Sequence, residues 1–276
     1  MTQNITNFVK SILDEDIGRG DLFARIQSPK SAKAIVGAKS AGVFAGQIYA
    51  IELAKEARLE LDFFVCDGDL IDRGAKLLEV RGDDIAILQA ERSLLNLLQH
   101  ASGIATQTRR YADRLKDCPI ALLDTRKTRP LLRRFEKYAA RIGGAVNHRF
   151  GLDDCLMIKD THLATIGDLK AFIQKARKNI PWTATIEVEC ETIETAQAAF
   201  EAKADIAMCD NMDVETIKTV VALRDKLSPS TKIEASGDIT LENIDRYKTT
   251  RIDAVSVGAI VHRAVWLNFS MKMLNG

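Results

Sequence analysis

Apolar positions follow two different spacings along this chain, and the change falls near residue 119. Beyond that point, short apolar runs rich in β-branched residues alternate with segments of helical periodicity. The runs predict strands at 120–123, 155–158, 185–188, 205–209, 232–235 and 254–257. Because strands that alternate with helices pair in parallel through right-handed crossovers, we expect a doubly wound sheet or a barrel.

Residues 1–103 are patterned differently. Strand-like runs at 34–38, 61–66 and 75–80 are mixed with helical segments at 5–14 and 47–58. A long amphipathic helix then begins near Asp83 and Asp84, either of which can cap it, and it carries Arg92 ahead of a cluster of leucines. This part of the chain predicts a small α/β unit.

Polar residues or glycine follow every expected strand of the second part. In a barrel, the carboxyl ends of the strands converge on one face, where they can build a site. A solvated loop start remains the alternative at any single end. The residues concerned are Arg126 and Lys127, Lys159, Glu189, Asp210, Ser236 and Gly237, and Gly258.

Two of these residues are acids at the ends of successive strands. Neighbouring carboxylates such as Glu189 and Asp210 can hold a magnesium ion that also binds a pyrophosphate, although each could instead cap a helix or pair with a cation. Glu187 points to the same side of its strand as Glu189. The strand pattern therefore leaves open which of the two glutamates faces a ligand.

The other strand-end residues also allow more than one interpretation. Ser236, Gly237 and Gly258 can offer backbone N–H groups to a phosphate, or they can form plain turns. Lys159 could be the Schiff-base lysine of an aldolase. His148 lies within a basic run and is either a structural histidine or a hydrogen-bond donor to a carboxylate.

The densest charge of the chain lies between Asp124 and Arg149. This stretch holds eight lysines and arginines, together with His148, against two acids, Asp124 and Glu136, although the net charge of the protein is +1. Turn-forming residues such as Pro130 interrupt it and apolar residues alternate with its cations, which argues against a uniform solvated face. The small net charge argues against a nucleic-acid partner. We therefore expect a concave pocket for a strongly anionic small molecule.

Length and composition set the remaining limits. A chain of 276 residues, 46% of them hydrophobic, can form a barrel and a smaller companion domain. Its five cysteines are odd in number and form no Cys-x-x-Cys pair, which favours reduced thiols over disulfides or a zinc site. There is no signal-peptide core and no apolar stretch of about eighteen residues. We expect a cytoplasmic protein without a membrane partner.

A series of motifs, in order along nearly the whole chain, closely resembles the quinolinate phosphoribosyltransferase family. The motifs are Glu15-Asp16-Ile-Gly-Arg-Gly-Asp21, Glu91-Arg-Ser-Leu-Leu-Asn-Leu-Leu-Gln99, Ser102-Gly-Ile-Ala-Thr106, Asp124-Thr-Arg-Lys-Thr128, Glu136-Lys-Tyr138, Gly143-Gly144, Asn147-His-Arg149, Ile158-Lys-Asp160, Asp210-Asn211 and Glu234-Ala-Ser-Gly237.

The resemblance implies both a fold and a reaction. The fold is an amino-terminal α/β sandwich at 1–103, rejoined by residues 263–276, and an open seven-stranded α/β barrel at 104–262. Because the apolar pattern predicts only six strands there, residues 145–147 would form a short seventh. In the reaction, quinolinate and phosphoribosyl pyrophosphate give nicotinate mononucleotide, carbon dioxide and pyrophosphate with magnesium, a late step of de novo NAD synthesis.

The resemblance also implies the roles of individual residues. The quinolinate-binding residues of the family fall on Arg92, Arg126, His148, Arg149 and Lys159, and the partner subunit of a homodimer, or of a hexamer built from dimers, would offer Arg92. The residues for phosphoribosyl pyrophosphate and magnesium fall on Lys127, Glu189, Asp210, Ser236, Gly237 and Gly258. Lys127, Lys159, Glu189 and Asp210 would be the catalytic group, which favours Glu189 over Glu187.

One segment departs from the family pattern. Many members have Pro-Gly-Leu after the Asp-Thr-Arg-Lys-Thr motif, whereas this chain has Arg129-Pro130-Leu131-Leu132. The absence of glycine predicts a stiffer loop with altered closure and removes no ligand residue.

Two other functions are open to simple tests. A basic nucleic-acid-binding module would bind strands with a steep salt dependence in a mobility-shift assay. A Schiff-base aldolase would be inactivated by borohydride only when its carbonyl substrate is present, through Lys159.

Overall fold

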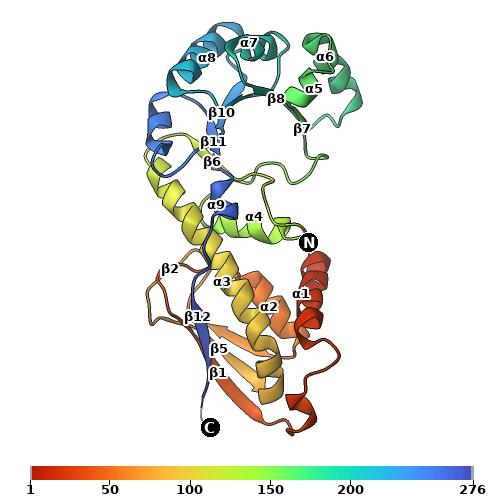
Figure 1. The fold of residues 1–276 in the computed structure, drawn as a ribbon, viewed down its shortest axis with the longest axis vertical. Helices are drawn as coiled ribbons and strands as arrows, with labels where there is room; N and C mark the ends of the chain where they lie inside the picture. The colour runs from red at the N-terminus through yellow and green to blue at the C-terminus, as the bar shows by residue number, and fades with distance from the viewer. Residues whose placement is uncertain (1, 275–276) are drawn as a thin grey trace. The chain divides into compact units, whose positions relative to one another are not determined.

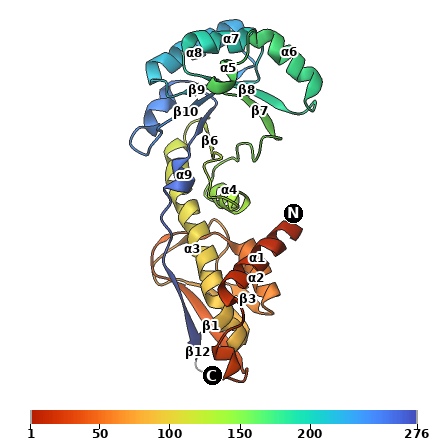
Figure 2. The same ribbon diagram turned by 45° about the vertical axis from the view of Figure 1, so that its right-hand side comes forward.

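The computed structural model describes residues 2–274, and these divide into two units. The first unit contains the residues up to Gln107 together with the segment from Ala264 onward, and the second contains Thr108–Arg263. Figures 1 and 2 show the elements of each unit.

The first unit is built on a four-stranded antiparallel sheet with the strand order β12-β1-β5-β3. The strands are β1 (Ser31–Ala38), β3 (Glu60–Phe63), β5 (Lys76–Asp83) and β12 (Phe269–Leu274). On β1, the side chains of Ala34, Val36 and Ala38 are buried and alternate with more exposed ones, as expected for a strand with one covered face. Pairing of β12 with β1 brings the last described residues to this sheet.

Helices complete the first unit. They are α1 (Thr2–Ile17), α2 (Gln47–Glu56), the 3-10 helix η1 (Phe23–Arg25) and the start of α3 (Asp84–Leu115), with a small pair of strands, β2 (Gly42–Val43) and β4 (Leu70–Ile71). Asp83 caps α3 as expected, because its carboxylate accepts the N–H groups of Ile85 at 2.8 Å and Ala86 at 3.2 Å. Ile87, Leu94, Leu98 and Ile104 on α3 are fully buried, so this helix contributes much of the core.

The second unit is an open parallel sheet with the strand order β6-β11-β10-β9-β8-β7. Its strands are β6 (Ala121–Leu123), β7 (Cys155–Ile158), β8 (Thr185–Cys190), β9 (Ile206–Asp210), β10 (Lys232–Ser236) and β11 (Ala254–Ser256). Val146 adds a single parallel bridge to Leu123, so the seventh strand expected at 145–147 is reduced to one residue. The α/β class, with its antiparallel first sheet and parallel second sheet, is confirmed.

Helices connect these parallel strands. They are α4 (Arg133–Ile142), α5 (Asp160–Leu163), α6 (Leu169–Asn179), α7 (Ile193–Glu201), α8 (Val214–Leu227), η2 (Ile244–Thr249) and α9 (Ala259–His262). Helices α6, α7 and α8 lie side by side along one face of the sheet, as both ribbon views show. Consequently Ile186, Val188 and Cys190 of β8 are buried beneath helices, and the side chains between them point to the opposite face.

The observed elements differ from the expected ones mainly at their ends. Strand β8 continues to Cys190, two residues beyond the expected end, whereas the strand expected at 61–66 stops at Phe63. Strands β2 and β4 span two residues each, too few for a periodic signal. Within residues 2–274, no helix combines the length and the apolar character needed to cross a bilayer.

Candidate active site

A cavity of about 540 Å³ opens at the carboxyl ends of the parallel strands of the second unit. This is the place where a barrel gathers side chains from separate strands. It brings together nine of the residues expected from the sequence: Arg126, Lys127, His148, Arg149, Lys159, Glu189, Asp210, Ser236 and Gly237. Gly258 lines a smaller adjoining cavity that shares Lys127, Ser236 and Gly237 with the larger one.

Two guanidinium groups form the cationic side of the cavity. Arg149 donates from Nη1 to the carbonyl of Cys155 at 3.1 Å and from Nη2 to the sulfur of Met157 at 3.2 Å, both on β7. Burial, with the nearby charges of Arg149 and Arg133, lowers the pKa of Arg126 from its ordinary value. Nη1 of Arg126 is buried and has no hydrogen-bond partner among the described residues. An anion entering here would satisfy a donor that the protein leaves unpaired.

A buried ion pair fixes the segment that carries His148 and Arg149. Lys137 on α4 and Asp124, directly after β6, are both fully buried, and Nζ of Lys137 donates to Oδ1 of Asp124. Asp124 also accepts the side-chain amide of Asn147 at 2.6 Å and the N–H of His148 at 2.8 Å. Lys137 donates to the carbonyl of His148 at 2.9 Å. Burial raises the pKa of Asp124 and lowers that of Lys137, so each needs the other to stay charged.

The same helix holds the loop that follows β6. Glu136, the residue before Lys137, is fully buried, and its carboxylate accepts the N–H of Arg129 at 2.9 Å and Nη1 of Arg129 at 2.6 Å. Arg133 at the start of α4 donates to the hydroxyl of Thr128 at 3.2 Å and to the carbonyl of Phe150 at 2.8 Å. Helix α4 thus orients both cation-bearing segments of the cavity.

Carboxylates also line the cavity. Glu189 on β8 accepts Nζ of Lys159 at 2.5 Å, and Asp210, the last residue of β9, accepts the side-chain amide of Asn211 at 2.8 Å. Glu187 does not line the cavity and instead lies fully buried beneath it. The Lys159 side chain is 43% exposed and ion-paired, which is unlike the buried free amine of an imine-forming aldolase.

Two glycines also line the cavities: Gly237 lines both of them, and Gly258 lines the smaller one. Gly237 has φ of 93°, and a Cβ built on it would collide with the side chain and backbone of Asn211. A Cβ on Gly258 would lie 3.0 Å from Cδ of Lys127 and 3.2 Å from the ring of His262. The lack of a side chain therefore allows Asn211 to pack closely against Gly237, and Lys127 and His262 against Gly258.

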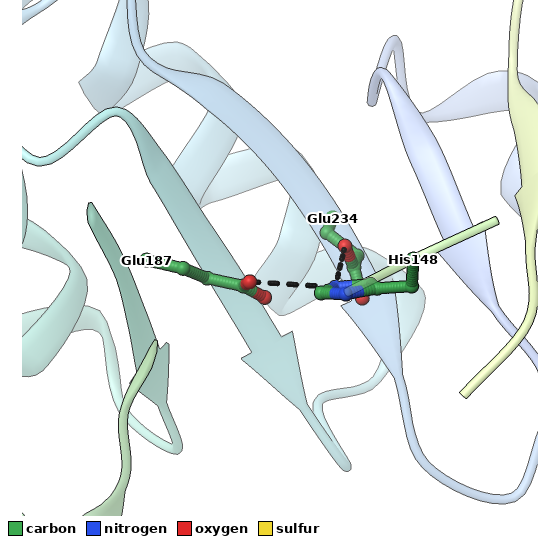
Figure 3. A group of neighbouring side chains, drawn as sticks. All are labelled: His148, Glu187 and Glu234. Carbon is green, nitrogen blue, oxygen red and sulfur yellow. Dashed lines mark ion pairs between the residues drawn. The ribbon is translucent and has the colours of Figure 1, made fainter. Parts of the chain in front are cut away.

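The structure adds three residues that sequence reasoning did not assign to the site. His262 follows Gly258 on α9 and lines the smaller cavity; burial and the charges of Arg263, Lys127 and Arg129 lower its pKa. Glu187 and Glu234 lie on either side of His148, each with a carboxylate oxygen 3.3 Å from Nε2 (Figure 3). The sequence offered Glu187 only as an alternative to Glu189 and Glu234 only as part of a family motif.

Arg92 is the one expected site residue that lines neither cavity. It is exposed on α3 within the first unit, whereas the residues lining both cavities belong to the second unit. Its side chain makes no ion pair with any residue from 2 to 274.

Comparison with known proteins covers both units. The profile "Quinolinate phosphoribosyl transferase, C-terminal domain" matches residues 104–272, and that of the N-terminal domain matches residues 21–102. A probable nicotinate-nucleotide pyrophosphorylase (carboxylating) of Bacillus subtilis is 43% identical over 94% of this chain and 90% of its own length. A probable nicotinate-nucleotide pyrophosphorylase (carboxylating) of Synechocystis is 38% identical over 98% of this chain and 92% of its own length. The crystal structure of NadC from Streptococcus pyogenes superposes with a TM-score of 0.93 at 38% identity, covering 100% of this chain and 99% of that one.

Proposed function

Because the chain belongs to the quinolinate phosphoribosyltransferase family, we propose that the cavity of the second unit is the active site of the family's reaction. The activity is that of a carboxylating nicotinate-nucleotide pyrophosphorylase, a pentosyltransferase. It transfers phosphoribosyl from phosphoribosyl pyrophosphate to quinolinate in NAD biosynthesis and gives nicotinate mononucleotide, pyrophosphate and carbon dioxide.

The observation that carries the proposed site is the gathering of several cationic side chains in one cavity. Quinolinate has two adjacent carboxylates, and these match Arg126, whose buried Nη1 lacks a partner, together with Arg149, His148 and Lys159. Arginine forks bind carboxylates through two charge-assisted hydrogen bonds, each worth about 1.5–3 kcal/mol. The dianion therefore belongs on the cationic side of the cavity.

Phosphoribosyl pyrophosphate belongs on the opposite side. Lys127 and Gly237 line both cavities and Gly258 lines the smaller one, where backbone N–H groups can bind phosphate oxygens. Ser236, the last residue of β10, adds a hydroxyl next to them. The two substrates would then meet between the strand ends, with their reacting atoms held close together.

Magnesium suits the acid pair. Glu189 and Asp210 both line the cavity from neighbouring parallel strands, and carboxylate oxygens are the ligands that magnesium prefers. We propose that these two residues hold the ion. When bound, magnesium would neutralise charge on the departing pyrophosphate. Lys159 pairs with Glu189 and fixes the position of that carboxylate at the cavity.

The side chains of the cavity then account for the two stages of the reaction, transfer of the phosphoribosyl group and loss of carbon dioxide. Arg126 and Arg149 orient the diacid so that its ring nitrogen faces the ribose, and a carbon–nitrogen bond forms as the carbon–oxygen bond to pyrophosphate breaks. The alkylated ring is cationic, and its positive nitrogen stabilises the electron pair that stays on C2 when carbon dioxide departs. A proton then takes the place of the lost carboxylate. The protein supplies orientation and charge in these steps, not a nucleophile.

We propose further that the protein works in the cytoplasm as a homodimer, to whose sites Arg92 is contributed across the interface. The exposure of Arg92 on α3 and its lack of an ion pair among residues 2–274 support this arrangement. Dimers could assemble further into hexamers, which light scattering would distinguish.

The decisive experiment incubates the purified protein with quinolinate, phosphoribosyl pyrophosphate and magnesium. Formation of nicotinate mononucleotide with equimolar carbon dioxide and pyrophosphate is expected, and a chelator should abolish it. Nicotinate serves as the matched substrate with one carboxylate, and turnover of nicotinate without turnover of quinolinate would overturn the proposal. Glu194→Gln, an exposed substitution on α7, serves as the control variant.

A further inference from the structure

Lys159 has two competing partners in the cavity of the second unit. Its Nζ donates to Oε2 of Glu189 at 2.5 Å, and the same ammonium is one of the cations proposed to bind a carboxylate of quinolinate. Glu189 in turn is one of the two acids proposed to hold magnesium. The ion pair therefore joins a residue proposed for one substrate to a residue proposed for the other.

Lys159 differs in this respect from the other lysines and arginines that line the cavity. Arg126, Lys127 and Arg149 form no ion pair with any residue from 2 to 274. Arg149 donates only to a carbonyl and a sulfur, which are neutral, and Nη1 of Arg126 has no partner in this part of the chain. An anion that binds Arg126 therefore displaces no carboxylate, whereas an anion that binds Lys159 competes with Glu189.

The surroundings of the ion pair show which side chain can move. Glu189 lies within β8, in register with Met208 of β9, and its side chain is 8% exposed. The Lys159 side chain is 43% exposed and ends a flexible stem of four carbons. The backbone of Lys159 is fixed, because its N–H donates to Nδ1 of His162 at 2.9 Å and its carbonyl accepts the N–H of His162 at 2.9 Å. The ammonium can therefore leave Glu189 while its backbone stays at the cavity.

The charge on Glu189 determines when the ammonium leaves. In the ligand-free cavity, Glu189 is largely removed from water, and the ammonium of Lys159 supplies the opposite charge that it needs. A divalent cation held by Glu189 and Asp210 would supply that charge instead and would repel the ammonium. Quinolinate then offers the released ammonium a carboxylate in place of Glu189.

We infer that Lys159 couples the two substrate sites: its ammonium pairs with Glu189 in the ligand-free cavity and moves to a carboxylate of quinolinate when magnesium and pyrophosphate occupy the acid pair. This inference rests on the proposed function of the cavity. Quinolinate alone binds more weakly than quinolinate with the metal complex, because it must first break the ion pair. Since coupling is reciprocal, quinolinate strengthens binding of magnesium and pyrophosphate by the same factor.

Calorimetric titration of the metal-free protein with quinolinate tests the ion pair without any assay of activity. Glu189→Gln keeps the shape of the side chain and removes the charge that holds Lys159. We expect quinolinate to bind this variant about fivefold or more tightly than it binds the wild type. Unchanged or weaker binding would overturn the inference, because Lys159 would then not be withheld from quinolinate by Glu189.

Asp210→Asn is the matched control for this titration. It removes one negative charge from the same cavity, but Asp210 accepts only the side-chain amide of Asn211 and forms no ion pair among residues 2–274. Removal of any nearby negative charge strengthens binding of an anion to some extent. A gain in Asp210→Asn as large as that in Glu189→Gln would show that the ion pair is not the cause.

A second control removes the ammonium. Lys159→Met should weaken binding of quinolinate, and in this background Glu189→Gln should increase the affinity by no more than Asp210→Asn does in the wild type. A gain in the double variant equal to the gain in Glu189→Gln alone would mean that Glu189 acts independently of Lys159. Glu194→Gln, on the exposed side of α7, should match the wild type.

A titration in the presence of magnesium and pyrophosphate measures the coupling itself and requires no variant that could fail to fold. This probe contains the metal and the leaving group and cannot transfer a phosphoribosyl group to quinolinate. Saturation of the wild type with it should raise the affinity for quinolinate about fivefold or more, and most of this gain should be lost in Glu189→Gln. Pyrophosphate with a chelator in place of magnesium should give no gain. Absence of a gain in the wild type, or an equal gain in Glu189→Gln, would overturn the inference.

Failure of the proposed function gives a different result. A wild-type protein that binds no quinolinate, with or without the probe, would overturn the proposed function together with the coupling. A wild-type protein that binds quinolinate and forms nicotinate mononucleotide, but whose affinity for quinolinate is unaffected by the probe, would overturn the coupling alone.

Discussion

At the scale of single residues, Arg126 offers the sharpest test of the cavity. Its buried Nη1 has no partner among residues 2–274, so truncation should remove a contact to the substrate and leave a substrate carboxylate unpaired. We expect Arg126→Ala to lose about 2–5 kcal/mol of transition-state stabilisation, read from kcat/KM for quinolinate. Arg126→Lys should recover part of this loss because it restores charge without the fork. Near wild-type turnover of the alanine variant would mean that the pocket is misplaced.

Leu131 adopts a backbone conformation that is costly for a residue other than glycine. It has φ of 65° and is 98% exposed, at the position where many family members have glycine. A left-handed conformation costs a non-glycine residue about 1–2 kcal/mol, partly offset by the larger unfolded-state entropy of glycine. Leu131→Gly should therefore raise the free energy of unfolding by about 0.5–1 kcal/mol in urea titrations.

Leu152 provides the matched control for this prediction. It is also an exposed leucine, but its φ is not among the positive values of the chain. Leu152→Gly should therefore lower stability slightly, because glycine relieves no strain there. Equal effects of the two glycine substitutions would show that the backbone of Leu131 is not the cause.

At the scale of elements, helix α4 should act as the support of the quinolinate pocket. Replacing Lys137 by Met leaves Asp124 buried without its cation and loosens the segment from 147 to 149. We expect a loss of about 3–5 kcal/mol of stability, measured by urea unfolding. In the folded enzyme, KM for quinolinate should rise more than KM for phosphoribosyl pyrophosphate.

A second substitution isolates the ion pair itself. The double variant Lys137→Met with Asp124→Asn removes both charges, and the amide can still accept the N–H of His148. It should regain part of the lost stability, as uncharged replacements of buried pairs commonly do. If the double variant is as unstable as the sum of the singles, the two residues act independently.

The elements also show what the sequence could predict. Strand β7 was expected at 155–158 and lies there, because both of its ends are marked by polar residues. The expected carboxyl ends converge because parallel strands share one direction, which is why nine of the expected residues line one cavity.

The partners of His148 could not be predicted from the sequence. The alternation of residues along a strand gives the face to which Glu187 and Glu234 point, but not which side chain they meet. His262 was missed for a similar reason, because its place beside Gly258 depends on the turn into α9.

At the scale of the whole molecule, Arg92 determines whether one chain is sufficient for activity. It belongs to the first unit, and the residues that line the cavities belong to the second. If a partner subunit supplies it, Arg92→Ala and Arg126→Ala should each be nearly inactive as pure dimers. After unfolding and refolding together in equal amounts, half of the dimers should be mixed, and each mixed dimer has one site with both arginines. The mixture should therefore recover about a quarter of wild-type activity.

The activity of the refolded mixture distinguishes three possible roles of Arg92. If Arg92 served the cavity of its own chain, no mixed dimer would contain a complete site, and the mixture would show only the average of the two inactive variants. If Arg92 had no role, Arg92→Ala alone would be active. Light scattering on the same samples gives the mass of the assembly, so recovered activity can be assigned to dimers or to hexamers. Activity can recover upon mixing only if Arg92 of one chain and Arg126 of the other contact the same substrate molecule. Neither variant can form such a site by itself.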